Sequence, residues 1–123
     1  MVNWKNTVAL TGTALAACIA LTAPGLAFPR YDGVWSVSIV TKKGDCIASY
    51  RYPMRIANGV LANGGDIAIN VSGKVAPSGA VVVKVSHGDK SAVGSGRLAG
   101  NLGSGSWSGA SCSGSWTAER RSS

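Results

Sequence analysis

The sequence predicts an all-β protein: a single small antiparallel up-and-down β-barrel of seven to eight strands, placed after a cleaved signal peptide. After residue 27 we find no helical apolar repeat, and Gly, Ser, Val and aromatic residues dominate. Turn signals recur roughly every 8–12 residues, a spacing typical of all-β folds. Between the turns, short segments alternate apolar and polar residues. A β-sandwich is the alternative, but we favour the barrel because closure removes exposed strand edges.

The first 27 residues have the pattern of an export signal. Lys5 is the only charged residue before Arg30, and apolar or small residues fill positions 8–23. Gly25-Leu26-Ala27 is a small-x-small site suited to signal peptidase. The apolar run is shorter than the ~20 residues that a membrane-spanning helix needs. We therefore expect a signal peptide over 1–27, a single barrel domain over 28–123 that is periplasmic or secreted, and no transmembrane span in the mature chain.

A second type of export signal is the alternative. Leu15-Ala16-Ala17-Cys18 resembles the lipobox of bacterial lipoproteins, in which Cys18 would carry the lipid anchor. Against this, residues 19–27 stay apolar, whereas the residues that follow a lipidated cysteine are usually polar.

The first two strands have the clearest alternation, which marks half-buried strands. Residues 33–40 form the first, with Trp35, Val37 and Ile39 on one face. A turn is expected at 42–45, and the second strand starts at Cys46. Its apolar face holds Cys46, Ala48, Tyr50, Tyr52, Met54 and Ile56. Its other face holds Ser49, Arg51, Pro53 and Arg55.

The middle strands are bounded by turn dipeptides. Asn58-Gly59 and Asn63-Gly64 are hairpin-type turns that leave only a short strand at 60–61. Alternation from Ile67 to Val75 predicts the next strand. After a turn at 77–79, the inward face of the following strand holds Val81, Val83 and Val85.

Glycine marks the inward face of the last three strands. Those faces hold Ala92, Gly94, Gly96 and Leu98, then Gly103, Gly105 and Trp107, then Cys112, Gly114, Trp116, Ala118 and Arg120. Glycines inside strands mark bends or the close approach of another group. We therefore consider Trp35, Tyr50, Tyr52, Trp107 and Trp116 to be candidate ligand-facing residues of the interior. Either these aromatic rings fill the space beside the glycines, or a ligand does.

A disulfide between Cys46 and Cys112 is expected in an exported chain, because these two cysteines remain once the signal is removed. Both fall in the inward phase near strand starts, which places the bridge near the barrel rim. Its loop of about 65 residues would contribute roughly 4 kcal/mol in the chain-entropy model. Two unpaired thiols are the alternative.

Charge points to anionic partners. The chain has a formal net charge of +7, and a basic surface favours anionic polysaccharide or lipopolysaccharide. A small molecule is the other expected kind of partner. Five basic residues point outward by parity: Arg51, Arg55, Lys74, Lys84 and Arg97. If neighbouring strands bring them together they form one binding face; the alternative is scattered, solvated charge. We expect no specific nucleic-acid partner.

Enzymatic chemistry lacks support in the sequence. His87 is the single histidine and is expected in an exposed turn, and no Gly-x-Ser-x-Gly segment is present. Cysteine and histidine spacing matches no zinc site, and no phosphate-binding loop occurs. We expect no catalytic residue, no metal and no cofactor.

Gly33-Val34-Trp35 and the arginines Arg120 and Arg121, at the two ends of the mature chain, resemble two short motifs of lipocalin-type and avidin-type barrels. Gly33-Val34-Trp35 resembles the Gly-x-Trp of their first strand. The resemblance implies that an arginine after the last strand, Arg120 or Arg121, packs across Trp35 at the closed barrel end. The chain also resembles small exported alphaproteobacterial proteins, through Arg51-Tyr52-Pro53 and the segment Cys112 to Arg121.

Together these features favour an exported, non-enzymatic binding protein for a small molecule or an anionic envelope glycan. The alternative is a periplasmic protein-interaction module, such as a protease inhibitor or an envelope structural protein.

Overall fold

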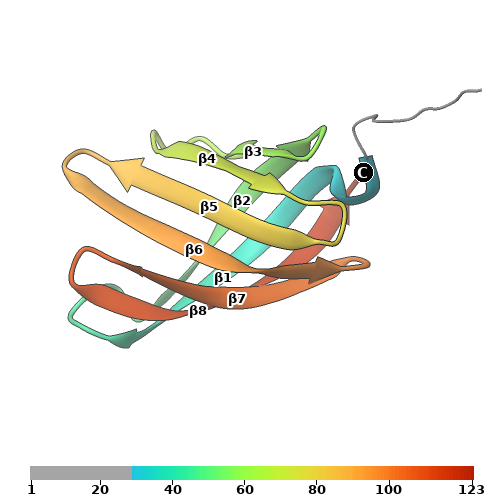
Figure 1. The fold of residues 1–123 in the computed structure, drawn as a ribbon. Coiled ribbons are helices and arrows are strands. Elements are labelled where there is room, and N and C mark those ends of the chain that lie inside the picture. The colour runs from blue at the N-terminus through green and yellow to red at the C-terminus, as the bar shows by residue number, and fades with distance from the viewer. Residues whose placement is uncertain (1–28) are drawn as a thin grey trace, which may run out of the picture.

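The computed structural model describes residues 29–123, which form a closed antiparallel barrel of eight strands in chain order (Figure 1). The all-β prediction is thereby confirmed, and the fold is the barrel and not the sandwich. The predicted signal peptide and Cys18 lie outside the described residues. A short 3-10 turn, η2 (Pro29–Tyr31), precedes the strands. The strands are β1 (Gly33–Lys43), β2 (Ser49–Ala57), β3 (Val60–Asn63), β4 (Asn70–Val75), β5 (Ala80–His87), β6 (Lys90–Ala99), β7 (Leu102–Gly109) and β8 (Cys112–Ser122).

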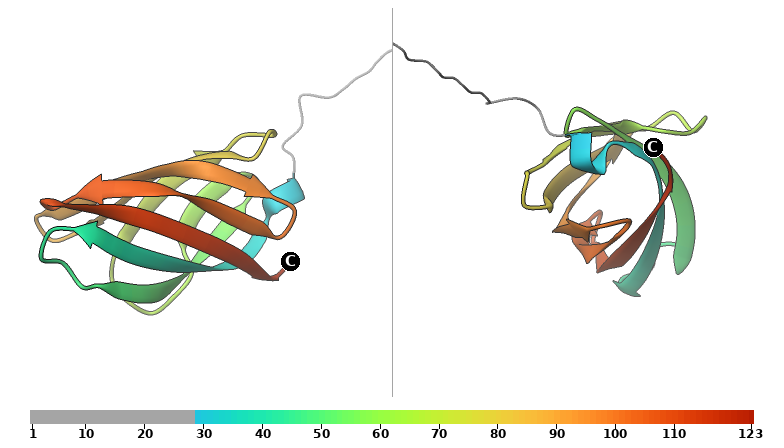
Figure 2. Two further views of the ribbon diagram at one scale, coloured as in Figure 1. Left: turned by 90° about the horizontal axis from the view of Figure 1, so that it is seen from below. Right: turned by 90° about the vertical axis from the view of Figure 1, so that its right-hand side faces the viewer.

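Each strand pairs with its neighbours in sequence, and β1 closes the barrel by pairing with β8 along most of its length. The β3–β4 contact is the weakest part of the wall, because it consists of one pair, Val60 with Lys74. The two views in Figure 2 show the closed wall from the side and from the end that carries η2.

The predicted alternation sets the inside of the barrel. Apolar residues of β1 and β2 point inward, and Trp35 is the most deeply buried, at 1% exposure. The core also contains Tyr52, Met54, Ile56, Leu61, Val81, Leu98, Trp116 and Ala118. Tyr31 of η2 is buried against this core and covers the end at which β8 finishes (Figure 1).

Two predicted strand starts are wrong, for local hydrogen-bonding reasons. β2 begins at Ser49 and not at Cys46, because the Thr41 hydroxyl donates to the Ile47 carbonyl at 2.6 Å and holds residues 44–48 as a loop. β4 begins at Asn70, and Ile67 is 58% exposed and not inward. The Asn63 amide donates to the carbonyls of Ile67 and Ile69, which holds 64–69 in a loop.

Two hairpins use turns whose central residues have positive φ, as type I′ turns require. In the β2–β3 turn these residues are Asn58 (φ 52°) and Gly59 (φ 76°), a well-suited pair. In the β7–β8 turn they are Ala110 (φ 53°) and Ser111 (φ 68°), which carry side chains that disfavour this conformation. The β7–β8 turn is therefore strained.

We expect Ser111→Gly to stabilise the protein by about 1 kcal/mol, because glycine adopts this φ without steric cost. In a domain of this size, the melting temperature should rise by about 4–8 °C. Ser104→Gly, at an exposed position of β7, is the matched control and should lower the melting temperature. An unchanged or lower melting temperature for Ser111→Gly would contradict the strain.

Candidate ligand cavity

A cavity of about 140 Å³ lies inside the barrel. All five aromatic residues singled out in the sequence line it: Trp35, Tyr50, Tyr52, Trp107 and Trp116. Aliphatic side chains complete the lining and include Val37 and Ile39 of β1 and Val81, Val83 and Val85 of β5. The cavity is therefore bounded almost entirely by carbon atoms.

The glycine-rich wall is occupied by Trp116 and not by empty space. A Cβ atom placed on Gly96 or Gly105 would lie 2.6 Å from the Trp116 ring. The indole Nε1 donates to the carbonyls of Ser95 and Ser106, both at 3.2 Å. Trp116 thus lies flat across β6 and β7. The Trp116 ring therefore fills the space beside these glycines, and the cavity lies beside the valines of β5.

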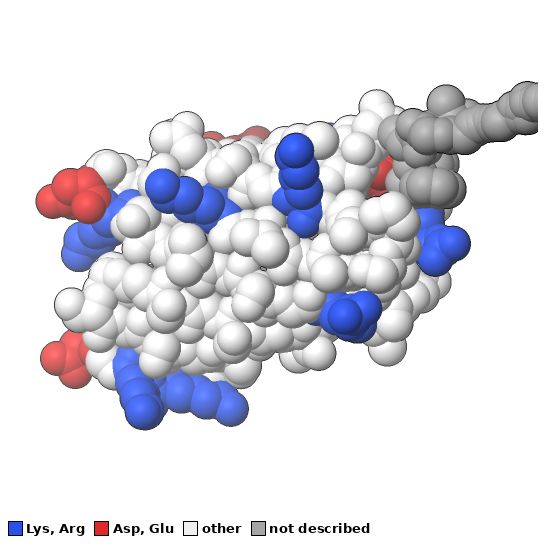
Figure 3. Space-filling view, viewed as in Figure 1, with Lys and Arg blue, Asp and Glu red and all other residues white. Residues whose placement is uncertain are grey.

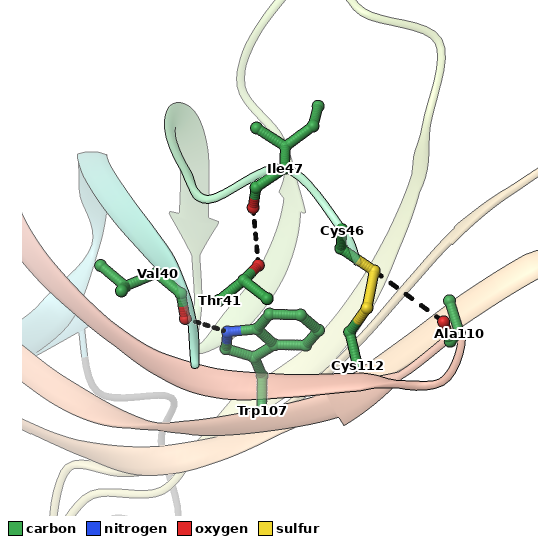
Figure 4. Close-up of a disulfide and its surroundings, with 7 residues drawn as sticks. All are labelled: Val40, Thr41, Cys46, Ile47, Trp107, Ala110 and Cys112. Atoms are coloured by element: carbon green, nitrogen blue, oxygen red, sulfur yellow. Dashed lines mark hydrogen bonds between the residues drawn. A yellow bond between two sulfur atoms is a disulfide. The ribbon is translucent and has the colours of Figure 1, made fainter. Parts of the chain in front are cut away.

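Trp107 uses the same arrangement nearer the rim. A Cβ atom on Gly114 would lie 3.0 Å from the Trp107 Nε1, so the indole crosses β8 at this glycine. Its Nε1 donates to the Val40 carbonyl at 3.1 Å (Figure 4). The ring thereby reaches from β7 over β8 to β1.

The polar atoms of the deeper aromatic residues are all used within the protein. The Trp35 Nε1 donates to the Tyr31 carbonyl at 2.9 Å. The Tyr52 hydroxyl, on a residue only 3% exposed, donates to the Asn63 Oδ1 and approaches the Ile67 carbonyl at 3.3 Å. Because buried polar groups need partners, these bonds leave the deep cavity without a free donor.

Burial raises the pKa of Tyr52 above its ordinary value of 10.0, and the nearby Asp66 carboxylate adds to the rise, while the bond to Asn63 opposes it. A raised folded-state pKa favours the neutral hydroxyl. The stability that this contributes is complete below the unfolded-state pKa and is lost as the pH rises above it.

The free energy of unfolding should therefore fall as the pH increases above 10, the ordinary pKa of tyrosine. In Tyr52→Phe this fall should be shallower, because the group responsible is gone. Urea denaturation at a series of pH values measures both slopes. Equal slopes in the two proteins would contradict the contribution of Tyr52.

Tyr50 marks the open end of the cavity. It is 48% exposed although it lines the cavity, and it pairs with Ile39 in the β1–β2 ladder. Among residues 29–123, no hydrogen bond of its hydroxyl to another protein group is found. Of the two cavity-lining tyrosines, Tyr50 is thus the exposed one and Tyr52 the buried one.

The loop 64–69 joins β3 to β4 and packs beside Tyr52 and Pro53 of β2. Hydrogen bonds from side chains, and not a strand ladder, fix the position of this loop. Asn63 donates to Ile67 O at 2.7 Å and accepts from Gly65 N at 2.8 Å, and His87 Nδ1 lies 3.1 Å from Ala68 O. The sequence does not reveal this role of Asn63, because an Asn-Gly pair indicates only a turn.

The predicted Cys46–Cys112 disulfide is confirmed, with its Cα atoms 6.3 Å apart. Cys46 lies in the β1–β2 loop and not on β2, so the bridge ties this loop to the start of β8. Figure 4 shows the bridge beside the Trp107 indole, and the Cys46 Sγ lies 3.9 Å from Ala110 O. The disulfide thereby anchors both the loop and the strained β7–β8 turn at the open end.

Arg120, and not Arg121, packs at the closed end. Its guanidinium carbon lies 5.1 Å from the centre of the Trp35 ring, a cation–π distance. It donates to Asn101 Oδ1 at 2.9 Å, Asp32 O at 2.7 Å and Gly100 O at 3.3 Å. Arg121 instead forms an exposed ion pair with Glu119.

Arg120→Ala should cost about 2 kcal/mol of stability, because it removes several hydrogen bonds and the ring contact. The neighbouring Arg121→Ala loses one exposed ion pair and should change stability by less than about 0.5 kcal/mol. Urea denaturation compares the two. Equal effects of both substitutions would refute the role assigned to Arg120.

The five outward basic residues are exposed, as their parity predicts, but they do not meet in one cluster. Lys74 and Lys84 lie on neighbouring strands, two residues apart in register. Arg97 pairs with Ala80, four residues from Lys84 along β5, and its guanidinium donates to Ser78 O. Arg51 and Arg55 lie on β2, on the other side of β3. In Figure 3 the basic side chains stand in several separate places.

We also searched residues 29–123 for metal sites and for membrane-spanning helices. No group of three His, Cys, Asp or Glu side chains that could hold a metal ion is found there. His87 lies at the exposed end of β5. Within the same range, no helix has the length and apolar character to cross a membrane.

Comparison of the chain with protein-family models, with curated proteins and with solved structures finds no match in any of the three.

Proposed function

We propose that this protein is an exported, non-enzymatic binding protein that holds a small apolar molecule inside its barrel. The observation that carries the proposal is the apolar cavity of about 140 Å³. Cavities of roughly 150 Å³ lined by aliphatic and aromatic side chains stay dry and bind benzene or xenon. A small hydrocarbon unit is therefore the guest that this space suits.

The chemistry of the lining argues against a sugar in the interior. The indole N–H groups of Trp35, Trp107 and Trp116 already donate to backbone carbonyls. A buried hydroxyl of a glycan would find no partner there, and an unpaired buried polar group is costly. An anionic glycan would have to bind outside, where the basic residues are spread over separated positions.

The proposed export agrees with two observations on different parts of the chain. The first 27 residues have the composition of a signal peptide. The Cys46–Cys112 disulfide is a bond typical of oxidising compartments such as the periplasm. The barrel also resembles lipocalin-type barrels in its Gly33-x-Trp35 motif and in the arginine stacked on that tryptophan.

Filling the cavity should abolish binding. Val83 lines the cavity, whereas Val82 next to it is 65% exposed on the outer face. We expect Val83→Phe to weaken benzene binding at least tenfold, because the ring takes the space of the guest. Val82→Phe is the matched control and should bind as the original protein does. Isothermal titration with benzene measures both.

Thermal unfolding must accompany the titration, because an added ring strains a packed interior by about 1–3 kcal/mol. If Val83→Phe does not fold, Val85→Leu provides a smaller filling of the same wall. Failure of the original protein to bind benzene would rule out the proposal, as would equal binding by a folded Val83→Phe.

A further inference from the structure

We infer that the ligand is a short amphipathic molecule: a hydrocarbon unit of about six carbon atoms lies in the cavity, and one hydrogen-bonding end group stays at the rim beside the Tyr50 hydroxyl. This inference rests on the proposed function, since it assigns the chemical class of the molecule that the cavity takes.

The size of the cavity sets the length of the apolar part. Its volume of about 140 Å³ is close to that of cavities that take one benzene molecule. The closed end of the barrel is filled by Trp35 and Arg120, which pack against each other. A longer hydrocarbon chain therefore cannot extend in that direction. Carbon atoms beyond about six would have to emerge at the rim.

The hydrogen bonds of the interior exclude a polar group at depth. Trp116 donates to Ser95 O and Ser106 O, and the Tyr52 hydroxyl donates to Asn63. A polar end group placed there would lose its bonds to water without gaining a protein partner. The molecule therefore enters with its hydrocarbon end first.

The rim offers the partner that the interior lacks. Tyr50 lines the cavity while 48% of its surface stays exposed, so this residue lies at the boundary between cavity and solvent. A tyrosine hydroxyl both donates and accepts, which suits an alcohol or a carboxylate. The charged residues at the β1–β2 and β5–β6 connections and the adjoining strand ends have both signs, with Lys42 and Lys43 close in sequence to Asp45, and Asp89 next to Lys90. The rim therefore selects by hydrogen bonding more than by net charge.

A series of straight-chain alcohols from butanol to decanol tests the length. Isothermal titration should give an affinity that rises about fourfold for each added methylene, the ratio that corresponds to about 0.8 kcal/mol per buried CH₂. The rise should stop near six carbon atoms. An affinity that rises without a break through decanol would overturn the inferred length.

Tyr50→Phe tests the end group, with benzene as the reference ligand. Removal of the hydroxyl should lower the affinity for hexanol about two- to tenfold, which is the ratio expected for one neutral hydrogen bond. The affinity for benzene should stay the same. Ser49→Ala alters the neighbouring residue and should change the affinity for neither hexanol nor benzene. Equal hexanol affinity in Tyr50→Phe would overturn the role of Tyr50 while the proposed function stands. Absence of benzene binding in the original protein would instead remove the proposed function itself.

Discussion

The position of the Trp116 indole determines what the interior of this barrel can hold. The ring lies flat on the backbone of Gly96 and Gly105, and its N–H is fixed by two carbonyls beyond them. Side chains usually fill the interior of a small eight-stranded barrel. Here the Trp116 ring of β8 packs flat on β6 and β7, so the cavity remains beside Val83 and Val85 of β5. The glycines of β6 and β7 are thus required by the tryptophan, and the cavity is a consequence of both.

The two ends of the barrel differ, and the difference gives the cavity a direction. At the closed end, η2 and Arg120 bury Trp35 and leave no path to solvent. At the other end, the walls are tied by a disulfide and by the amide of Asn63, while Tyr50 remains exposed. The disulfide and the Asn63 hydrogen bonds fix the loops at this end without placing side chains in the opening.

Period-two alternation was enough to predict most of the strands and most of their inward residues, because burial on one face fixes strand register. The disulfide was predicted from the two cysteines that remain in an exported chain. Alternation could not predict where β2 and β4 begin, because Thr41 and Asn63 end those ladders through side-chain bonds that leave no periodic signal. The aromatic lining was also visible as inward Trp and Tyr residues. The flat packing of Trp116 on the glycines, with the cavity beside the valines, could not be predicted. It depends on the orientation of the ring, and no sequence pattern indicates that orientation.

A crystal structure determined under xenon pressure would test the cavity most directly, because xenon enters dry apolar cavities of this size. Our account predicts strong xenon density inside the barrel between Val83 and the face of Trp116, with both side chains in the positions described. Absence of xenon there, with an indole turned into the centre of the barrel or ordered water in its place, would contradict the account.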